Sequence, residues 1–355
     1  MSREEVAAAF GRDLDPLAEH AEVLDGLDVD PFEIYLAETG PRADNTEENY
    51  RLTFSQWRAH MEEEGRHPAC PSKAHVESFL ERRADDGVMR STAAADLTNL
   101  GAAYSYWASD EAFPHSADFD PFDVEPPDRM ADGPDEYPQV GLDELRSIAS
   151  DAGHYLDRAV LVLQLKLGLR ASELCNVRLS EVNPDHGDLG DFYPDLGTHP
   201  EVCDRPGSLY VAAGREGNKS ARPRVLPLDD EARRCLVRYL LVRPACGRQE
   251  ALLSKRDKVP LNRKHVNTVW RSAVPDRLLE PGDGLRPVRS HFARHHFTTY
   301  WDVHEDVNSE LVAYMRGDAA GSRNQAGSES MAHYLHVYYS DIEQMYRERV
   351  FKLRL

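Results

Sequence analysis

The feature that most constrains the fold is a central segment without periodicity. Residues 110–140 (DEAFPHSADFDPFDVEPPDRMADGPDEYPQV) are rich in proline and aspartate, and they follow neither the period of a helix nor the alternation of a strand. Such a composition is typical of a linker between domains. At 355 residues, the chain is long enough for a separate hydrophobic core on each side. We therefore expect two domains joined by a linker over residues 111–140, an arrangement that could clamp around a cylinder.

Four amphipathic helices are predicted before the linker, over residues 30–110. Asn45 is the predicted cap of the second helix, with Glu48 closing a capping box, and Ser72 and Ser91 begin the next two. Apolar and aromatic side chains recur at helical spacing, among them Phe32, Tyr35, Phe54, Trp57, Phe79, Leu100, Tyr104 and Trp107. An aromatic stripe of this kind is far more often core than a cofactor site, so a small all-helical domain is expected. The acidic residues 1–29 read as a tail or a short helix.

After the linker, residues 141–355 predict a mainly α domain with a small antiparallel sheet. The best strand candidates are residues 208–213 and 223–228, and the segment between them, GREGNKSAR, is a turn-rich cationic hairpin tip. Helices are expected over residues 142–152, 155–167, 230–242, 262–273, 290–301 and 340–351. The apolar C-terminal end suits docking either on a neighbouring subunit or on its own domain, and the sequence leaves both open.

The charge balance bears on the class of partner. Acidic residues outnumber basic ones by 62 to 42, whereas a protein that binds nucleic acid usually has a basic face. The excess lies almost wholly in the first part, because residues 1–150 carry 34 Asp and Glu against 12 Lys and Arg, and residues 151–355 carry 28 against 30. The second part therefore remains compatible with DNA.

The choice of basic residue is also uneven, since only seven of the 42 are lysines. An acidic surface with arginine favoured over lysine resembles proteins of salt-loaded cytoplasms, such as those of halophilic archaea. There the Debye length falls to roughly 3 Å, and short arginine contacts would have to position DNA. An acidic surface kept only for solubility agrees equally well with these counts.

Localisation and redox state follow from simpler observations. No apolar run reaches transmembrane length, and residues 1–36 are punctuated by acidic side chains where a signal peptide would be apolar. We expect a soluble cytoplasmic protein. The absence of any C-x-x-C pair argues against a zinc ribbon or a disulfide scaffold. The five cysteines are therefore expected to be reduced packing residues: Cys70, Cys175, Cys203, Cys235 and Cys246.

The clearest chemical signal is the run RSHFARHHFTTY at residues 289–300. His291 and Arg294 lie three residues apart, so they share one face of a helix, while Phe292 and Phe297 can anchor the helix in a core. A planar guanidinium beside an imidazole suits a phosphate group, which accepts charge-assisted and often bidentate hydrogen bonds.

Three further pieces accompany this run. Gly-Leu-Arg170-x-x-Glu173-Leu precedes the cationic hairpin, and Tyr334 follows the run within ESMAHYLHV. In this order and spacing the chain resembles the tyrosine recombinases of the phage integrase family, which include Xer-like site-specific recombinases. The resemblance covers about residues 141–340 closely. Over residues 30–110 it is looser and corresponds to the SAM-like core-binding domain of the family.

The resemblance implies a two-domain DNA clamp that cleaves and rejoins duplex DNA. A tyrosine hydroxyl would form a 3′-phosphotyrosine link and leave a free 5′-hydroxyl, without a metal or nucleotide cofactor. Recombinases of this kind work as homotetramers on paired sites. By position, Tyr334 matches the nucleophile, and Tyr338 and Tyr339 are rivals a turn away.

The matched residues make physical sense of this reaction. Arg170 and Arg294 would hold the non-bridging phosphate oxygens, where charge gathers during attack. His291 would donate a further hydrogen bond or accept the proton of the nucleophile. Glu173, one helical turn after Arg170, would orient an arginine or a histidine.

Two positions depart from the family pattern. The family places a general-acid lysine on the hairpin, and here Arg215-Glu216 replaces the first expected lysine. We therefore assign the role to Lys219, because an arginine gives up its proton poorly, and we assign DNA contacts to Arg215 and Arg222.

The second departure follows Met315-Arg316-Gly317. The family has a histidine or tryptophan at the next position, and this chain has Asp318. An acidic side chain cannot repeat the role of a cationic donor. Asp318 would instead orient His295, or Arg316 would supply the missing donor.

Two other functions stay open on the residues alone. His291, His295 and His296 would be candidate ligands of a metal-dependent nuclease, although their spacings place them on different sides of a helix and no carboxylate accompanies them in the run. The altered hairpin and Asp318 also fit a DNA-binding protein of integrase descent with an impaired site.

Overall fold

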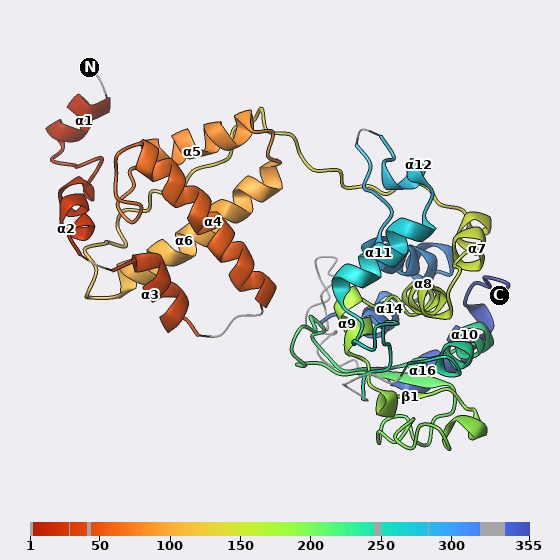
Figure 1. Ribbon diagram of the computed structural model, residues 1–355. Coiled ribbons are helices and arrows are strands. Elements are labelled where there is room, and N and C mark those ends of the chain that lie inside the picture. The colour runs from red at the N-terminus through yellow and green to blue at the C-terminus, as the bar shows by residue number, and fades with distance from the viewer. Residues whose placement is uncertain (1–2, 28, 41–43, 245–249, 283, 320–337) are drawn as a thin grey trace. The chain divides into compact units, whose positions relative to one another are not determined.

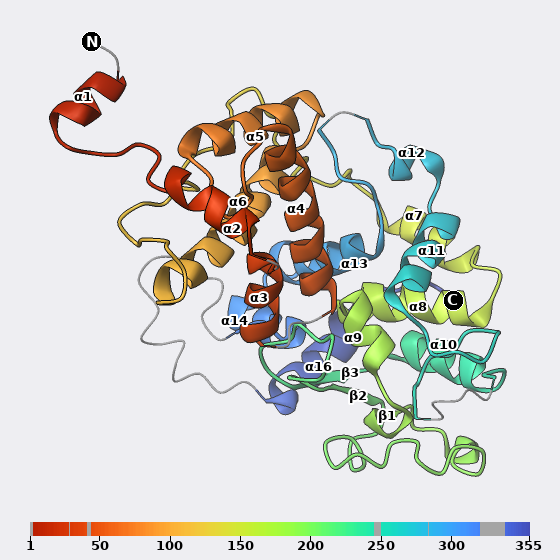
Figure 2. The same ribbon diagram turned by 60° about the vertical axis from the view of Figure 1, so that its left-hand side comes forward.

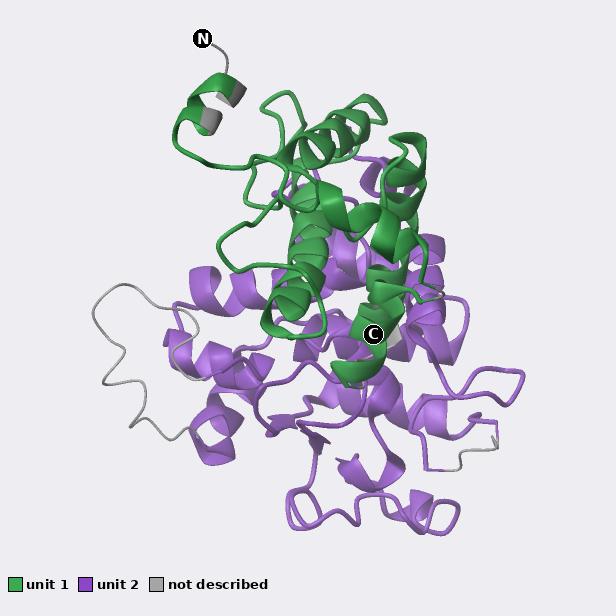
Figure 3. Cartoon of the chain, turned by 90° about the vertical axis from the view of Figure 1, so that its left-hand side faces the viewer, with its two compact units in different colours: residues 1–133 green, residues 134–355 purple. Residues whose placement is uncertain are grey.

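The computed structural model describes residues 3–27, 29–40, 44–244, 250–282, 284–319 and 338–355. Figure 1 traces the elements along the chain. The chain divides into two compact units, residues 1–133 and residues 134–355, which Figure 3 distinguishes by colour. Each unit has its own hydrophobic core.

Unit 1 is helical throughout its described elements. α6 packs against α3 and α4, and α5 packs against α4. Trp57, Phe54 and Trp107 are almost completely buried in the core. The elements are α1 (Arg3–Ala9), the 3-10 turn η1 (Ala18–His20), α2 (Ala21–Asp25), α3 (Pro31–Glu38), α4 (Asp44–Glu63), α5 (Lys73–Asp85) and α6 (Arg90–Ser109).

The helix starts in unit 1 follow local capping chemistry, with two differences from expectation. Asp30 accepts a hydrogen bond from the Phe32 N–H at 2.9 Å and so caps α3. Ser72 precedes α5, where the His75 ring accepts from the Ser72 N–H at 3.0 Å. Asn45, expected as a cap, lies inside the first turn of α4 instead, because that helix already includes Asp44. Ser91, expected to begin the last helix, lies inside the first turn of α6, which begins at Arg90.

The proline- and aspartate-rich segment after α6 is irregular, but part of it is packed. His115, Phe122 and Met130 are buried in unit 1, and Phe122 contacts Trp57 with ring centroids 5.6 Å apart. Leu17 and Leu24 from the acidic N-terminal stretch are buried in the same core. Isolated apolar side chains without a period therefore complete the core of this unit.

Unit 2 is mainly α with a small sheet, and its elements follow in chain order: α7 (Leu142–Ser150), α8 (Tyr155–Leu167), α9 (Ala171–Asn176), η2 (Leu179–Glu181), β1 (Val182–Asn183), η3 (Gly187–Leu189), β2 (Ser208–Val211), β3 (Arg224–Pro227), α10 (Asp230–Leu240), α11 (Arg263–Ala273), α12 (Asp276–Leu279), α13 (Ser290–Thr299), the π-helical turn η4 (Tyr300–His304), α14 (Ser309–Arg316) and α16 (Tyr339–Arg349).

α8 is the central helix of unit 2. Its residues from Leu156 to Leu167 are almost all buried, and it packs against α10, α11 and α13. Alanine, valine and leucine side chains from Ala159 to Leu167 occur on every side of this helix, so it has to be enclosed in this way. The strands form one antiparallel sheet in the order β1-β2-β3, with Leu209 of β2 opposite Leu226 of β3. α16 runs along β3, as Figure 2 shows.

The C-terminal tail docks on its own unit. Phe351 and Leu353 are buried, and Glu231 accepts a hydrogen bond from the Leu353 N–H at 2.7 Å. The fully buried Lys166 donates to Asp229 at 2.7 Å and to the Phe351 carbonyl at 2.9 Å. A lysine in that position needs these acceptors, because an unpaired buried charge is strongly destabilising.

The expected fold class, mainly α with a small antiparallel sheet, is confirmed. β1 and α14 were not expected, and the helix over 290–301 changes to a π-helical turn at Tyr300. Over the parts of the chain that the structure describes, no helix combines the length and apolar character needed to cross a membrane.

Candidate functional site

Arg294 lies on α13 and is almost completely buried. Its Nη1 donates to the Gly168 carbonyl at 3.0 Å and to the Arg316 carbonyl at 2.9 Å. Gly168 ends α8 with φ +62°, and a Cβ there would lie 2.6 Å from the Phe297 ring. Only glycine therefore lets the chain turn this closely against α13. The guanidinium is held by backbone from two separate segments.

Arg170 occupies the position before the first residue of α9. Glu173 returns from the first turn of that helix and accepts from the Arg170 N–H at 2.9 Å and from Arg170 Nη1 at 3.0 Å. The sequence spacing Arg-x-x-Glu thus builds a local clamp. The Nη2 group of Arg170 takes no part in this clamp and is directed at the same acceptor as Nη2 of Arg294.

The two arginines meet at Asp318. Its Oδ1 accepts from Arg294 Nη2 at 2.7 Å and from Arg170 Nη2 at 3.3 Å. Its Oδ2 lies 2.9 Å from Nε of Arg316. Two guanidinium groups from distant segments therefore converge on one anionic oxygen. The structure places Asp318 against three arginines rather than against His295.

Glu173 is the buried carboxylate behind this pair. Its Oε2 accepts from Arg224 Nη2 at 2.9 Å, and its Oε1 accepts from the Ser220 hydroxyl at 2.5 Å. Burial by itself raises the pKa of Glu173, but the charge of Arg224, the Ser220 hydrogen bond and the Arg170 N–H outweigh it and hold the pKa at about 2. The group is ionised at every physiological pH.

Arg224 is a site residue that the sequence reasoning missed. It is completely buried at the start of β3, and its Nε donates to the Met315 carbonyl at 2.8 Å. Gly317, with φ +71°, leaves the space for it, because a Cβ there would lie 2.8 Å from Arg224 Cζ. The available signal was an arginine opening a strand of otherwise buried residues, since a buried charge requires a buried partner.

The hairpin tip lies next to this cluster. Ala221 donates its N–H to the Gly317 carbonyl at 2.9 Å, and Ser220 contacts Glu173, while the neighbouring Lys219 is exposed. Arg215 is engaged within the protein, because it pairs with the buried Glu181. A DNA contact by Arg215 would have to replace that pair.

Arg222 differs from Arg215. Its guanidinium carbon lies 5.5 Å from the centroid of the Tyr314 ring, and among the described residues Nε and Nη2 have no hydrogen-bond acceptor. Desolvation lowers its pKa. Two N–H donor groups of Arg222 therefore have no acceptor among the described residues, and an anion could supply one.

His291 is the exposed member of the arginine face of α13. Partial desolvation, followed by the charges of Arg294 and Arg170, lowers the pKa of its imidazole. The ring is therefore neutral at pH 7 and can accept a proton. Burial and the charge of Arg170 lower the pKa of Arg294 to about 9, so that guanidinium remains charged.

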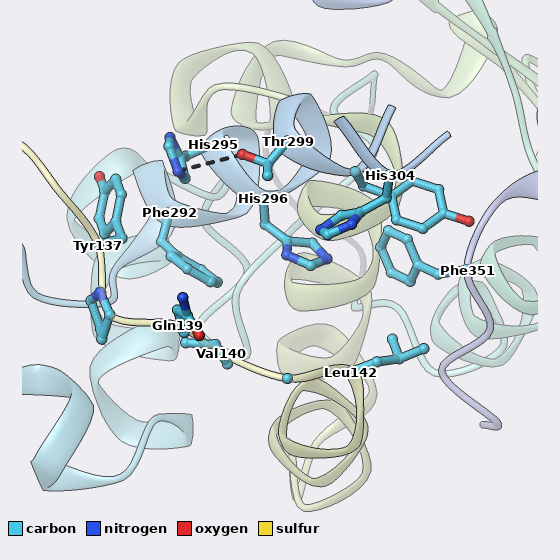
Figure 4. Close-up of a pocket in the computed structure, with 13 residues that line it drawn as sticks. Tyr137, Gln139, Val140, Leu142, Phe292, His295, His296, Thr299, His304 and Phe351 are labelled. Carbon is cyan, nitrogen blue, oxygen red and sulfur yellow. Dashed lines mark hydrogen bonds between the residues drawn. The ribbon is translucent and has the colours of Figure 1, made fainter. Parts of the chain in front are cut away.

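His295 and His296 lie apart from the arginine pair, along a cavity of about 760 Å³. Figure 4 shows His296 between Phe292 and Phe351, and His295 beside Thr299, with 3.5 Å between His295 Nε2 and the Thr299 hydroxyl. Burial lowers the pKa of His296 to about 4. Across the described ranges, no three His, Cys, Asp or Glu side chains gather where they could hold a metal ion.

Tyr334, the expected nucleophile, lies outside the described residues, as do the residues around it. Of the two rivals, Tyr339 is buried, and its hydroxyl donates to Glu343 at 3.0 Å and accepts from Arg347 at 3.2 Å. Burial raises its pKa to about 12. Tyr338 is exposed at the start of α16. Tyr339 is therefore committed to packing.

Comparison with known families gives two matches. The model of the phage integrase family matches residues 141–317, and the model of the N-terminal SAM-like domain of phage integrases matches residues 29–109. The first match contains Arg170, Lys219 and Arg294 of the site.

Solved structures give the same result for the fold. The Tn1549 transposon integrase in complex with transposon right end DNA is 16% identical, has a TM-score of 0.60, and is matched over 87% of this chain and 95% of its own. A lambda integrase dimer bound to a COC′ core site is 15% identical, has a TM-score of 0.56, and is matched over 89% of this chain and 76% of its own. At these identities the likeness shows a shared fold. The two family matches, one for each unit, show that the chain belongs to the phage integrase family of tyrosine recombinases.

Proposed function

We propose that the chain is a site-specific DNA recombinase that cleaves and rejoins strands through a 3′-phosphotyrosine intermediate. The observation that carries this proposal is the convergence of Arg170 and Arg294 on one oxygen of Asp318, at 3.3 and 2.7 Å. Two guanidinium groups on one anionic oxygen form the donor set that a phosphodiester under attack requires. Had the arginines lain in separate sites, the motif match would have had no chemistry behind it.

The reaction needs one bond made and one broken at phosphorus. The hydroxyl oxygen of Tyr334 attacks, the bond between phosphorus and the 5′-oxygen breaks, and the 3′-phosphate remains on the tyrosine. Negative charge grows on the non-bridging oxygens, where Arg170 and Arg294 stabilise it. Religation reverses these steps with the 5′-hydroxyl of another strand.

Two side chains handle the protons. His291 accepts the proton of the tyrosine, because partial burial and then the neighbouring arginines lower the pKa of its imidazole and keep the ring neutral at pH 7. Lys219 protonates the leaving 5′-oxygen. Its position on the hairpin next to Ser220, which contacts Glu173 in the site, supports this role.

Glu173 acts by position, because it orients Arg170 and neutralises the buried Arg224. Arg316 anchors Arg294 through its carbonyl. His295 lies next to the Tyr137 ring, with centroids 4.9 Å apart, and supports α13 from its other side.

The partner in this proposal is double-stranded DNA, held by both units and contacted by Arg222. Homotetramers on paired sites follow from the mechanism, since strand exchange needs four cleavages. The solved relatives support this expectation, because lambda integrase occurs as a dimer on a core site and as a tetramer bound to a Holliday junction.

The experiment is covalent trapping on a duplex with a nick beside the cleavage position. The 5′-hydroxyl fragment diffuses away, so a tyrosine-linked complex accumulates and survives denaturing electrophoresis. We expect trapping by the unaltered chain, undiminished in excess chelator, and none by Tyr334→Phe. Tyr338→Phe is the matched control and should trap normally.

Each alternative predicts a different result. Trapping that persists in Tyr334→Phe and disappears in Tyr338→Phe would contradict the choice of nucleophile. Cleavage abolished by chelator would indicate a metal-dependent nuclease. DNA binding without any trapping would support the second candidate, an impaired DNA-binding protein of integrase descent, which is favoured by the carboxylate of Asp318 on the arginine pair.

A further inference from the structure

The place where a phosphate oxygen would bind is filled by a side chain of the protein. Asp318 Oδ1 lies 2.7 Å from Arg294 Nη2 and 3.3 Å from Arg170 Nη2. A carboxylate and a phosphodiester both carry one negative charge and accept the same charge-assisted hydrogen bonds. They cannot occupy this position together.

The rest of Arg294 offers little alternative. Both hydrogens of Nη1 are directed at backbone carbonyls, those of Gly168 and Arg316. The remaining donors, Nη2 and Nε, are the ones through which this arginine would meet a phosphate. Asp318 is bound to one of them.

Asp318 is not needed to orient the pair. Arg294 is already fixed by two carbonyls, and Arg170 by Glu173 at 3.0 Å. A carboxylate that only held the arginines in place would duplicate these contacts. Its distinct effect is to occupy their free ends.

We propose that Asp318 is a built-in competitor for the scissile phosphate, which makes it a specificity-determining residue of the site. This inference rests on the proposed function above. Because one monoanion replaces another on the arginine pair, binding of a phosphodiester leaves the charge held by Arg170 and Arg294 unchanged. An isolated phosphodiester gains little from the exchange, whereas a DNA duplex brings many other contacts that drive it.

The chain also provides a route for the carboxylate to leave. Asp318 follows Gly317, whose φ of +71° already lies in the left-handed region. Its second oxygen, Oδ2, lies 2.9 Å from Arg316 Nε. The carboxylate can therefore give up the arginine pair and keep the contact with Arg316, so its charge stays neutralised.

The first test uses the full chain and dimethyl phosphate, a phosphodiester without bases or sugars, with binding followed by calorimetry at constant ionic strength. Asp318→Asn removes the carboxylate that competes for the arginine pair, so it should bind dimethyl phosphate about tenfold more tightly or better. Asp306→Asn is the matched control. It removes one exposed negative charge of the same unit at a positive φ of 47°, a conformation that asparagine tolerates as well as aspartate, and should bind like the unaltered chain.

Unchanged or weaker binding by Asp318→Asn would overturn the proposal and make Asp318 a positioning residue. The nicked-duplex assay keeps this separate from the proposed function. If Asp318→Asn binds dimethyl phosphate more tightly but no Tyr334-dependent trapping occurs, the recombinase chemistry is refuted and the inference about Asp318 is retained. If trapping depends on Tyr334 but Asp318→Asn binds dimethyl phosphate no more tightly, the inference about Asp318 is refuted and the recombinase chemistry is retained.

A structure of the unaltered chain on nicked DNA decides the matter if the variant does not fold. The Asp318 carboxylate must then have left Arg294 Nη2, with a phosphate oxygen in its place. A phosphate bound elsewhere, with Asp318 still on that nitrogen, would refute the inference.

Discussion

Replacing Glu173 by glutamine should destabilise unit 2 strongly, and the loss should depend on pH. Glu173 is completely buried and accepts from Arg170, Arg224 and Ser220. Its pKa is about 2 in the folded chain against 4.5 ordinarily, which corresponds to about 3 kcal/mol of stability at pH 7. Leaving the buried Arg224 without a carboxylate gives a similar cost, about 3 to 5 kcal/mol.

The sign of the pH dependence follows from the lowered pKa. A carboxylate with a depressed folded-state pKa stabilises the protein above its unfolded pKa, and that contribution is lost as the pH falls toward 2. At pH 3.5 the contribution of Glu173 should have fallen from about 3 to about 2 kcal/mol. The difference in unfolding free energy between the unaltered chain and Glu173→Gln should narrow by the same amount.

The assay is urea denaturation of both proteins between pH 7 and pH 3.5, followed by tryptophan fluorescence, to which the buried Trp270 and Trp301 of unit 2 contribute beside Trp57 and Trp107 of unit 1. Glu216→Gln, which removes an exposed charge from the β2–β3 hairpin, is the control and should change stability by less than about 0.5 kcal/mol. Taking the difference between variants cancels the other titrating carboxylates. A gap that stays constant across this pH range would refute the assignment of the ionised Glu173 as the support of the arginine cluster.

Gly317→Ala should lower the unfolding free energy by about 3 kcal/mol or more, because the new Cβ would clash with Arg224 in addition to the cost of a positive φ. Gly214→Ala is the control in the same denaturation experiment. Its φ of +69° is similar but the space around it is open, so the unfolding free energy should fall by only about 1 to 2 kcal/mol. Lys219→Arg should bind DNA normally but trap it about a hundredfold more slowly, because a guanidinium is a poor proton donor. A duplex whose leaving 5′-oxygen is replaced by sulfur should restore its rate, since a thiolate leaves without an acid. Glu231→Gln should lower the unfolding free energy by about 2 kcal/mol, because it weakens the acceptor of the C-terminal backbone N–H groups, and proteolysis of the C-terminal tail should become faster.

Local periodicity was enough to predict most helices of unit 2. α8, α10 and α11 begin and end within about two residues of the expected limits, because each has a clear apolar face or run and a capping residue at its start. The β2–β3 hairpin was equally accessible, since two short apolar runs flank a tip rich in glycine. These features depend on neighbours in the sequence.

The pairings inside the site could not be predicted in this way. Glu173 and Arg224 are 51 residues apart, and nothing in the sequence around either one identifies the other. Arg215 illustrates the same limit, because the pattern made it a DNA contact whereas Glu181, 34 residues away, binds its guanidinium. The choice among several acidic partners is made by the tertiary fold.

The buried pairs also explain how a chain with net charge −20 can concentrate cations at one point. Among the contacts of the described residues, Glu173 and Asp318 are the carboxylates that bind Arg170, Arg224 and Arg294, so these three guanidinium groups keep a local excess of positive charge. Attraction over distances beyond the Debye length is screened by salt, whereas contacts near 3 Å inside a buried cluster are screened much less. If Asp318 yields its position to a phosphate, the affinity of the site comes from this protected excess rather than from the acidic surface. The salt dependence of the exchange at Asp318 should therefore be weak, and that of DNA contacts made by the exposed Lys219 stronger.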